Sequence, residues 1–172
     1  MSRTLNEPIV NKDIISCWEK LLNYLKFTMG SLKVEHFRVL FLNFKNVLLA
    51  DELLATGTVS HTPVYAREIF RRALFHDASA IVLIHNHPSG DPTPSAKDIS
   101  YTLKIIDACK VIDVKVLDHI IIAENKYFSF NETFETGGDI SCFNTNMKKM
   151  FLAKKVQNFS KDIIMRKRHN HL

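Results

Sequence analysis

The sequence predicts an α/β fold in which helices flank a mixed β-sheet. Strand-like and helix-like segments alternate through the middle of the chain, as they do where helices connect the strands of a sheet. Two strand-like runs joined by a short polar turn precede this region, and further strand-like runs follow it. The first pair predicts an antiparallel hairpin, so we expect parallel and antiparallel neighbours within one sheet.

The first half of the chain contains the hairpin between two predicted helices. Residues 11–27 and 65–76 each carry apolar side chains at helical spacing. Between them, residues 34–42 and 47–53 have the composition of strands, and the polar segment 43–46 predicts the turn that joins them.

The second half begins with the most apolar segment of the chain. Residues 79–85 form an almost continuous apolar run, which is typical of a strand buried on both faces. Turn-forming residues at 87–92 end this run, and a helix is predicted over 95–111. Three short strands are expected after this helix, at 114–117, 119–123 and 127–130.

Size and composition indicate one globular domain. The 172 residues are 46% hydrophobic and 24% charged, which suits one sizeable core but not two ordinary domains. No apolar run reaches the roughly 18 residues of a membrane helix, and the first residues lack the apolar stretch of a signal peptide. The three cysteines lie far apart with no Cys-x-x-Cys pair, so neither a disulfide framework nor a zinc–thiolate site is indicated. We expect a cytoplasmic protein with free thiols.

The basic character of the chain lies in its C-terminal segment. Of the 23 Lys and Arg residues and 18 acidic residues behind the net charge of +5, residues 141–172 hold eight basic and one acidic. The remainder of the chain therefore carries a net charge of −2. We predict an N-terminal arm at 1–10, a domain at 11–135 and a basic tail at 136–172, whose apolar spacing also fits an amphipathic helix.

Two histidines and an aspartate follow the apolar run at a spacing that suits a metal ion. His85 and His87 lie two residues apart at a strand end, so their imidazoles can share one side of the sheet. The following turn reverses the chain, and Asp98 in the first turn of the next helix can point back toward them. Two imidazoles and one carboxylate leave a fourth zinc position open for water, as catalytic sites do, whereas structural zinc sites have four protein ligands. The sequence therefore predicts a catalytic zinc site.

Such a site needs a base beside the water. Glu35 begins an apolar strand and is expected at the rim of the sheet, and Ser95 could donate a hydrogen bond to an oxyanion. Each has a simpler interpretation: Glu35 as an exposed strand-end carboxylate, and Ser95-Ala-Lys-Asp98 as a helix capping box. The cap is compatible with catalysis because it would fix the helix end that presents Asp98.

The five residues together resemble the JAMM signature of the MPN-domain metalloproteases. His85-Asn-His87 is followed after seven residues by Ser95-Ala-Lys-Asp98, and Glu35 lies upstream. The string His-Asn-His-Pro-Ser-Gly-Asp-Pro-Thr-Pro-Ser is similar to the RadC-type branch, bacterial proteins traditionally labelled DNA-repair proteins. The resemblance implies an MPN/JAMM, cytidine-deaminase-like fold and one Zn²⁺ per chain on His85, His87 and Asp98. It also implies water activation by Glu35, support from Ser95, and a peptide or isopeptide substrate.

The resemblance covers about residues 8–134 and has three departures. The N-terminal helical region usual in RadC-type proteins has no match, so DNA binding attributed to that region is not expected here. Ala66 stands where the family generally has a proline, and the tail at 136–172 has no counterpart.

Other metal and nuclease chemistries fit less well. The HNH nuclease signature is spread over a ββα unit, with its residues separated by many others. A zinc deaminase would need His-x-Glu and a later Pro-Cys-x-x-Cys, and the second is absent. An iron oxygenase would need a His-x-Asp/Glu pair, which is also missing. Four further histidines are expected to be surface or core groups and not ligands: His36, His61, His76 and His119.

The main alternative is a non-catalytic MPN-fold protein that binds DNA or other partners through the basic tail. Clustered Lys and Arg at 141–172 could neutralise phosphates and give a salt-dependent affinity. A basic amphipathic helix could equally bind a membrane surface or pack on its own domain. The sequence leaves the substrate and the oligomeric state open.

Overall fold

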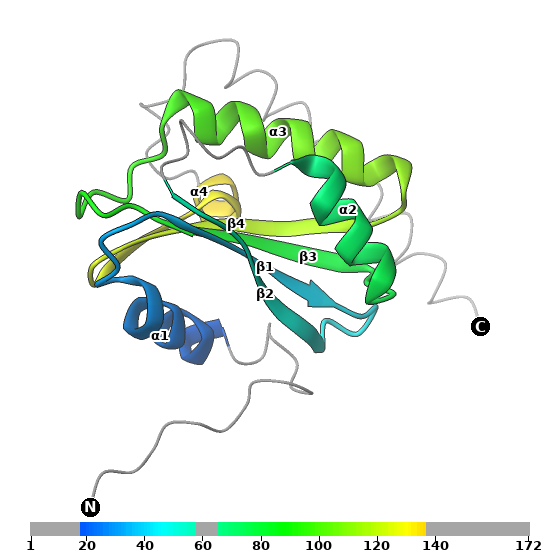
Figure 1. Ribbon diagram of the computed structural model, residues 1–172, viewed down its shortest axis with the longest axis horizontal. Coiled ribbons are helices and arrows are strands. Elements are labelled where there is room, and N and C mark those ends of the chain that lie inside the picture. The colour runs from blue at the N-terminus through cyan, green and yellow to red at the C-terminus, as the bar shows by residue number, and fades with distance from the viewer. Residues whose placement is uncertain (1–17, 58–64, 137–172) are drawn as a thin grey trace, which may run out of the picture. The chain divides into compact units, whose positions relative to one another are not determined.

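The computed structural model describes residues 18–57 and 65–136, which contain four helices and a five-stranded sheet (Figure 1). The helices are α1 (Trp18–Met29), α2 (Ala66–Phe75), α3 (Ala96–Val111) and α4 (Phe130–Thr136). The strands are β1 (His36–Leu42), β2 (Leu48–Thr56), β3 (Ala80–Asn86), β4 (Lys115–Ala123) and β5 (Lys126–Ser129). The chain divides into two units, residues 1–131 and 132–172, and the sheet lies in the first.

The sheet is mixed, as the sequence predicts. Its strand order is β2-β1-β3-β4-β5, with β3 and β4 parallel and the other neighbouring pairs antiparallel. The central strand β3 is buried at all seven positions, which agrees with its almost continuous apolar composition.

Helices cover both faces of this central strand. In Figure 1, α1 lies on one face of the sheet, and α2 and α3 lie on the other. Ile84 packs in the core beneath α1, whereas Leu83 packs in the core beneath α2 and α3. Because side chains alternate along a strand, His85 continues the face of α2 and α3, and Asn86 continues the face of α1.

The expected strand break near residue 118 is wrong. The predicted strands 114–117 and 119–123 form the single strand β4, because the pairing with β3 resumes at Asp118, opposite Val82, after a one-residue register shift. Its buried carboxylate accepts hydrogen bonds from Ser129 Oγ at 2.6 Å and from the Asn131 N–H at 2.9 Å. These bonds offset the cost of burying a charged group inside a strand.

Several element ends also differ from the predictions, and β2 continues to Thr56, three residues beyond its expected end at 53. The last predicted strand (127–130) is observed as β5, and Phe130 begins α4, a helix that the sequence analysis did not predict. The first predicted helix continues to Met29, two residues beyond its expected end at 27.

Several predicted segments lie outside the described residues. These are the arm at 1–10, the start of the first helix, most of the loop after β2, and the tail beyond residue 136. The domain boundary at residue 135 therefore stays a prediction. None of the described helices is both long enough and apolar enough to span a membrane.

An ion pair fastens α2 to the edge strand β2. Arg72 donates hydrogen bonds to the Glu52 carboxylate through both Nε, at 2.6 Å, and Nη2. His76 Nε2 lies 2.6 Å from the same carboxylate. The Arg72 hydrogen bonds, helped by His76, lower the pKa of Glu52 to about 2.

Replacing this carboxylate should weaken the fold in a pH-dependent way. The Glu52 pKa is lower in the folded state than its ordinary value of about 4.3, so the carboxylate stabilises the fold above that pH. The stabilisation is lost as the pH falls toward 2. We expect Glu52→Gln to lower the free energy of unfolding by about 1 kcal/mol at pH 7, and by progressively less below pH 4.

Urea denaturation of both proteins at several pH values measures this difference. Asp107→Asn, which alters an exposed pair with Lys110, is the control and should have little effect. A Glu52→Gln penalty that stays constant between pH 7 and 3 would contradict the assignment.

Candidate metal centre

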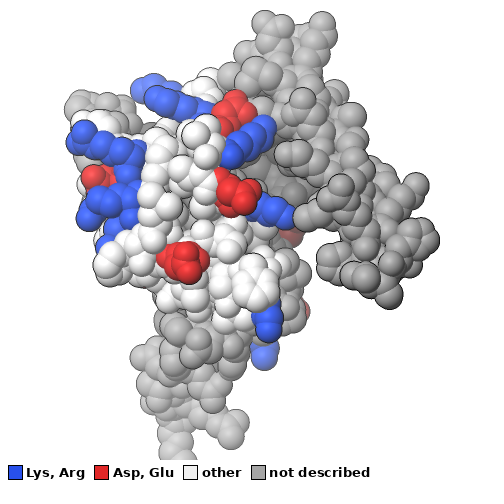
Figure 2. Space-filling view, turned by 90° about the vertical axis from the view of Figure 1, so that its right-hand side faces the viewer, with Lys and Arg blue, Asp and Glu red and all other residues white. Residues whose placement is uncertain are grey.

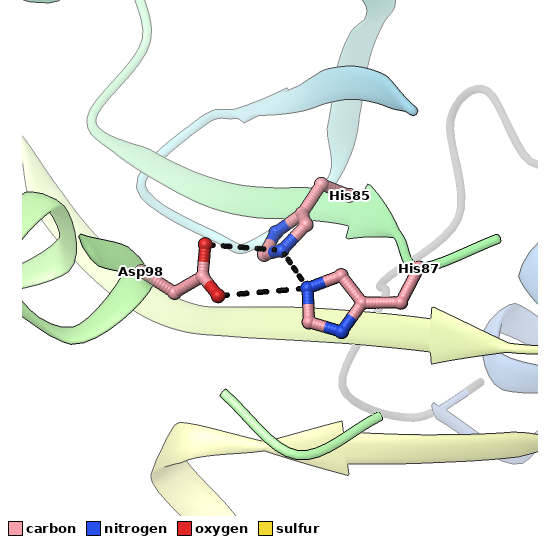
Figure 3. A group of neighbouring side chains, drawn as sticks. All are labelled: His85, His87 and Asp98. Atoms are coloured by element: carbon pink, nitrogen blue, oxygen red, sulfur yellow. Dashed lines mark hydrogen bonds and ion pairs between the residues drawn. The ribbon is translucent and has the colours of Figure 1, made fainter. Parts of the chain in front are cut away.

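The end of β3 and the start of α3 bring three side chains together. His87 follows the strand directly, and its N–H donates to the Ile122 carbonyl of β4 at 2.8 Å. The backbone is therefore still held at the sheet, and the His85 and His87 imidazoles share one side of it. Asp98 lies in the first turn of α3. Figure 3 shows the three side chains pointing toward one another.

The distances between the three side chains suit one tetrahedral metal ion. The Nε2 atoms of His85 and His87 lie 3.0 Å apart, and the Asp98 oxygens lie 3.3 Å from His85 Nε2 and 3.5 Å from His87 Nε2. Tetrahedral zinc with bonds of about 2.0–2.1 Å would separate its ligand atoms by roughly 3.3 Å. Two unprotonated imidazole nitrogens this close repel each other unless a proton or a cation lies between them. The group can therefore hold a metal ion.

Burial makes the charge of Asp98 the dominant electrostatic feature of the site. Its side chain is only 5% exposed. Burial by itself would raise the pKa of Asp98, but hydrogen bonds with His85, His87 and Ser95 outweigh it and hold the pKa well below its ordinary range. The carboxylate is therefore ionised, as a metal ligand must be.

Ser95 caps α3 and holds the Asp98 carboxylate in place. Its N–H and its hydroxyl donate to Asp98 Oδ2 at 2.7 and 2.6 Å, and the Asp98 N–H donates to Ser95 Oγ at 3.1 Å. The predicted capping box is thus confirmed. The catalytic role of Ser95 stays a prediction.

Glu35 directly precedes β1, whose register with β3 pairs Phe37 with His85, and the backbone around Glu35 is held on both sides. Gly57 N–H donates to the Glu35 carbonyl at 2.9 Å. Asn86, which is 1% exposed, accepts from the His36 N–H at 2.7 Å and donates to the Val34 carbonyl at 3.2 Å. The side-chain amide of Asn86 thus takes the place of a peptide group between β3 and the residues around Glu35.

Glu35 contributes to the electrostatic environment of the His87 imidazole. Burial lowers the pKa of His87, but Asp98 and the Asp91 carbonyl outweigh burial and raise it, and Glu35 adds a smaller contribution. Glu35 is therefore close enough to act electrostatically on the centre. Its role as a base stays a prediction, as do the ligand roles of His85, His87 and Asp98.

A second layer of contacts lies behind the ligands, and the sequence analysis did not foresee it. His119 is buried, as expected of a core group, but its Nε2 lies 2.8 Å from His85 Nδ1. Its Nδ1 lies 2.6 Å from Thr102 Oγ1. Burial lowers the pKa of His119 well below its ordinary value. The only sequence signal was the i, i+4 spacing that places Thr102 on the same helix face as Asp98.

Two further histidines that the structure describes do not belong to the metal-binding group. His36 and His76 lie among the described residues but outside the group formed by His85, His87 and Asp98, and His76 pairs with Glu52. His61 lies outside the described residues.

Comparison with known proteins gives a consistent result. The family model of the RadC-like JAB domain matches residues 15–136. A UPF0758 protein of Ruegeria pomeroyi is 49% identical over 122 residues, covering 71% of this chain and 54% of that protein. A UPF0758 protein of Rhodobacter capsulatus is 46% identical over 128 residues, covering 74% of this chain and 60% of that protein. The chain thus spans little more than half the length of these relatives.

Removal of one ligand should abolish metal binding without unfolding the domain. We expect the purified chain to retain close to one divalent transition-metal ion, and His85→Ala to retain almost none, because two ligands bind far more weakly than three. His76→Ala, which alters a histidine outside the cluster, should retain the ion. Metal analysis after dialysis measures this, with circular dichroism to verify folding. A wild-type chain without metal would contradict the assignment.

Loss of the Asn86 amide should loosen the backbone around Glu35. In Asn86→Ala the partly buried His36 N–H loses its acceptor, so we expect a loss of about 1 kcal/mol in stability and faster exchange of that amide. The His87 N–H, which donates to β4, serves as the internal control. Hydrogen exchange followed by NMR measures both amides. An unchanged rate at His36 would show that Asn86 does not hold this segment.

Proposed function

The chain belongs to the RadC-like JAB domain family, and we propose that it is a zinc-dependent hydrolase of peptide or isopeptide bonds. The observation that carries the proposal is the convergence of His85, His87 and Asp98 at one point, with the charge of Glu35 within reach of it. Three protein ligands leave a coordination position open, which is the pattern of catalytic and not of structural zinc.

The bound ion would supply Lewis acidity and would lower the pKa of a water at the open position to about 7. His85 and His87 would hold it through Nε2, and Asp98 through its carboxylate. Glu35 would accept the proton of the attacking water and pass it to the leaving amine, the usual work of a carboxylate base. Its position next to the backbone clamp of Asn86 and Gly57 favours this role, because a base must be held still to act at hydrogen-bond distance.

Ser95 would have two roles in this scheme. Its hydroxyl now donates to Asp98 Oδ2, where it orients the carboxylate ligand. To stabilise an oxyanion at the scissile carbonyl, the same hydroxyl would have to turn away from Asp98, which its N–H would continue to hold.

Removal of the base should separate catalysis from metal binding. We expect Glu35→Gln to lower hydrolysis by about 10²–10⁴-fold, the usual contribution of general acid–base catalysis, while zinc content stays unchanged. Glu124→Gln, an exposed carboxylate on the β4–β5 turn, is the matched control and should hydrolyse at the wild-type rate. Turnover of a library of peptides and isopeptides measures the effect. Full activity in Glu35→Gln would overturn the assignment of the base.

The alternative function, DNA binding through the basic tail, has separate support. The tail at 141–172 carries eight of the 23 basic residues. On the face in Figure 2, the described Lys and Arg side chains lie among Asp and Glu side chains. Exposed ion pairs such as that of Arg71 with Glu68 also occur among the described residues. A DNA affinity that falls steeply with salt and disappears when 141–172 is deleted would favour this alternative.

A further inference from the structure

A continuous chain of hydrogen bonds runs behind the candidate metal centre and links two of its ligands. It passes from His85 Nδ1 to His119 Nε2 at 2.8 Å, and from His119 Nδ1 to Thr102 Oγ1 at 2.6 Å. Thr102 Oγ1 then donates to the backbone carbonyl of Asp98 at 2.6 Å. All four residues are at most 5% exposed, so water does not compete for these bonds.

The Thr102 hydroxyl determines which atom donates and which accepts in this series of hydrogen bonds. It has a single proton, and the Asp98 carbonyl can only accept, so that proton goes to the carbonyl. Thr102 Oγ1 must then accept from His119, which places a proton on His119 Nδ1. The assignment follows from the donors and acceptors alone.

The surroundings of His119 determine which ring nitrogen of His85 carries the proton in the hydrogen bond between the two rings. Its ring stacks on Phe130, with centroids 5.2 Å apart, and meets the edge of Phe37 at 6.0 Å. The two ring nitrogens contact His85 and Thr102, whereas the neighbouring Asp118 carboxylate accepts from the His119 backbone N–H. A charged imidazolium would be costly in such a cage, so the neutral ring accepts at Nε2. His85 therefore carries a proton on Nδ1, which leaves Nε2, the atom that faces Asp98 and His87, as the ring nitrogen available to a cation.

We propose that His119 and Thr102 are positioning residues that hold the His85 imidazole in its metal-binding tautomer and tie it to the helix turn that presents Asp98. This inference rests on the proposed function in one respect, the role of His85 as a metal ligand. Partners behind a ligating histidine orient its ring and strengthen it as a ligand, and their loss typically weakens metal binding by about 10–100-fold. Here the partners also connect β3, β4 and α3, so the two ligands move as one unit.

The first test reads the tautomers directly on the metal-free full-length chain. Long-range ¹H–¹⁵N NMR of the imidazole nitrogens distinguishes Nδ1–H from Nε2–H rings. We expect Nδ1–H signatures for both His85 and His119 in the wild type. Thr102→Val keeps the side-chain shape but removes the acceptor, so His119 should lose its single tautomer. A wild-type His85 protonated on Nε2 alone would overturn the proposal.

The second test measures zinc affinity by competition with a chromogenic chelator. Thr102→Val and His119→Phe should bind zinc about 10–100-fold more weakly than the wild type. Thr102→Ser and His119→Gln, which keep a hydroxyl and an acceptor, should restore most of the affinity. If Thr102→Val folds, as circular dichroism reports, and binds zinc as tightly as the wild type, the proposal fails.

The two tests separate this proposal from the proposed function. The tautomer measurement needs neither metal nor substrate, so it reports on the hydrogen bonds of His119 and Thr102 even if the protein hydrolyses nothing. A wild type that binds no zinc would overturn the metal role of His85 and with it the positioning role. Normal hydrolysis by a protein in which His85 is protonated on Nε2 alone would overturn the positioning role of His119 and Thr102 and leave the proposed function standing.

Discussion

The buried carboxylate of Asp98 is the constraint on which the rest of the site depends. A charge that is almost removed from water must be compensated by close donors or by a cation. Ser95 supplies two donors to Oδ2 from the helix cap, while His87 faces the same oxygen and His85 faces Oδ1. The cap of α3, the tip of β3 and the turn between them are therefore coupled through one group. A metal ion at the centre of the three ligands would complete that compensation.

The central strand β3 supplies two different parts of the site because its side chains alternate. His85 points to the face of α2 and α3, where it meets His87 and Asp98 in the group that could hold a metal ion. Asn86 serves the opposite face, where its amide holds the backbone on either side of Glu35. This one strand therefore positions the two histidines and also holds the backbone around the proposed base, which lies 50 residues away in the sequence.

In this site the charged group lies at the candidate metal position, and neutral groups lie behind it in the interior of the domain. Asp98 carries a negative charge at the candidate ligand positions, whereas the second layer behind His85 consists of a neutral imidazole, a hydroxyl and a backbone carbonyl. A neutral second layer can direct protons without competing for the cation. The aromatic rings of Phe37 and Phe130 keep it dry.

The sequence by itself determined the parts of the protein that depend on neighbours along the chain. Strand periodicity, a dense turn and a capping box lie within 14 residues, so the meeting of His85, His87 and Asp98 could be predicted from local rules. Local rules failed at Asp118, where hydrogen bonds from distant residues keep a charged side chain inside β4. The position of the Glu35 backbone relative to His85 depends instead on tertiary pairing, in the antiparallel register that places Phe37 opposite His85. The tertiary structure alone also revealed that His119 and Thr102 stand behind the ligands, because a hydrogen bond between β3, β4 and α3 depends on packing and not on sequence spacing.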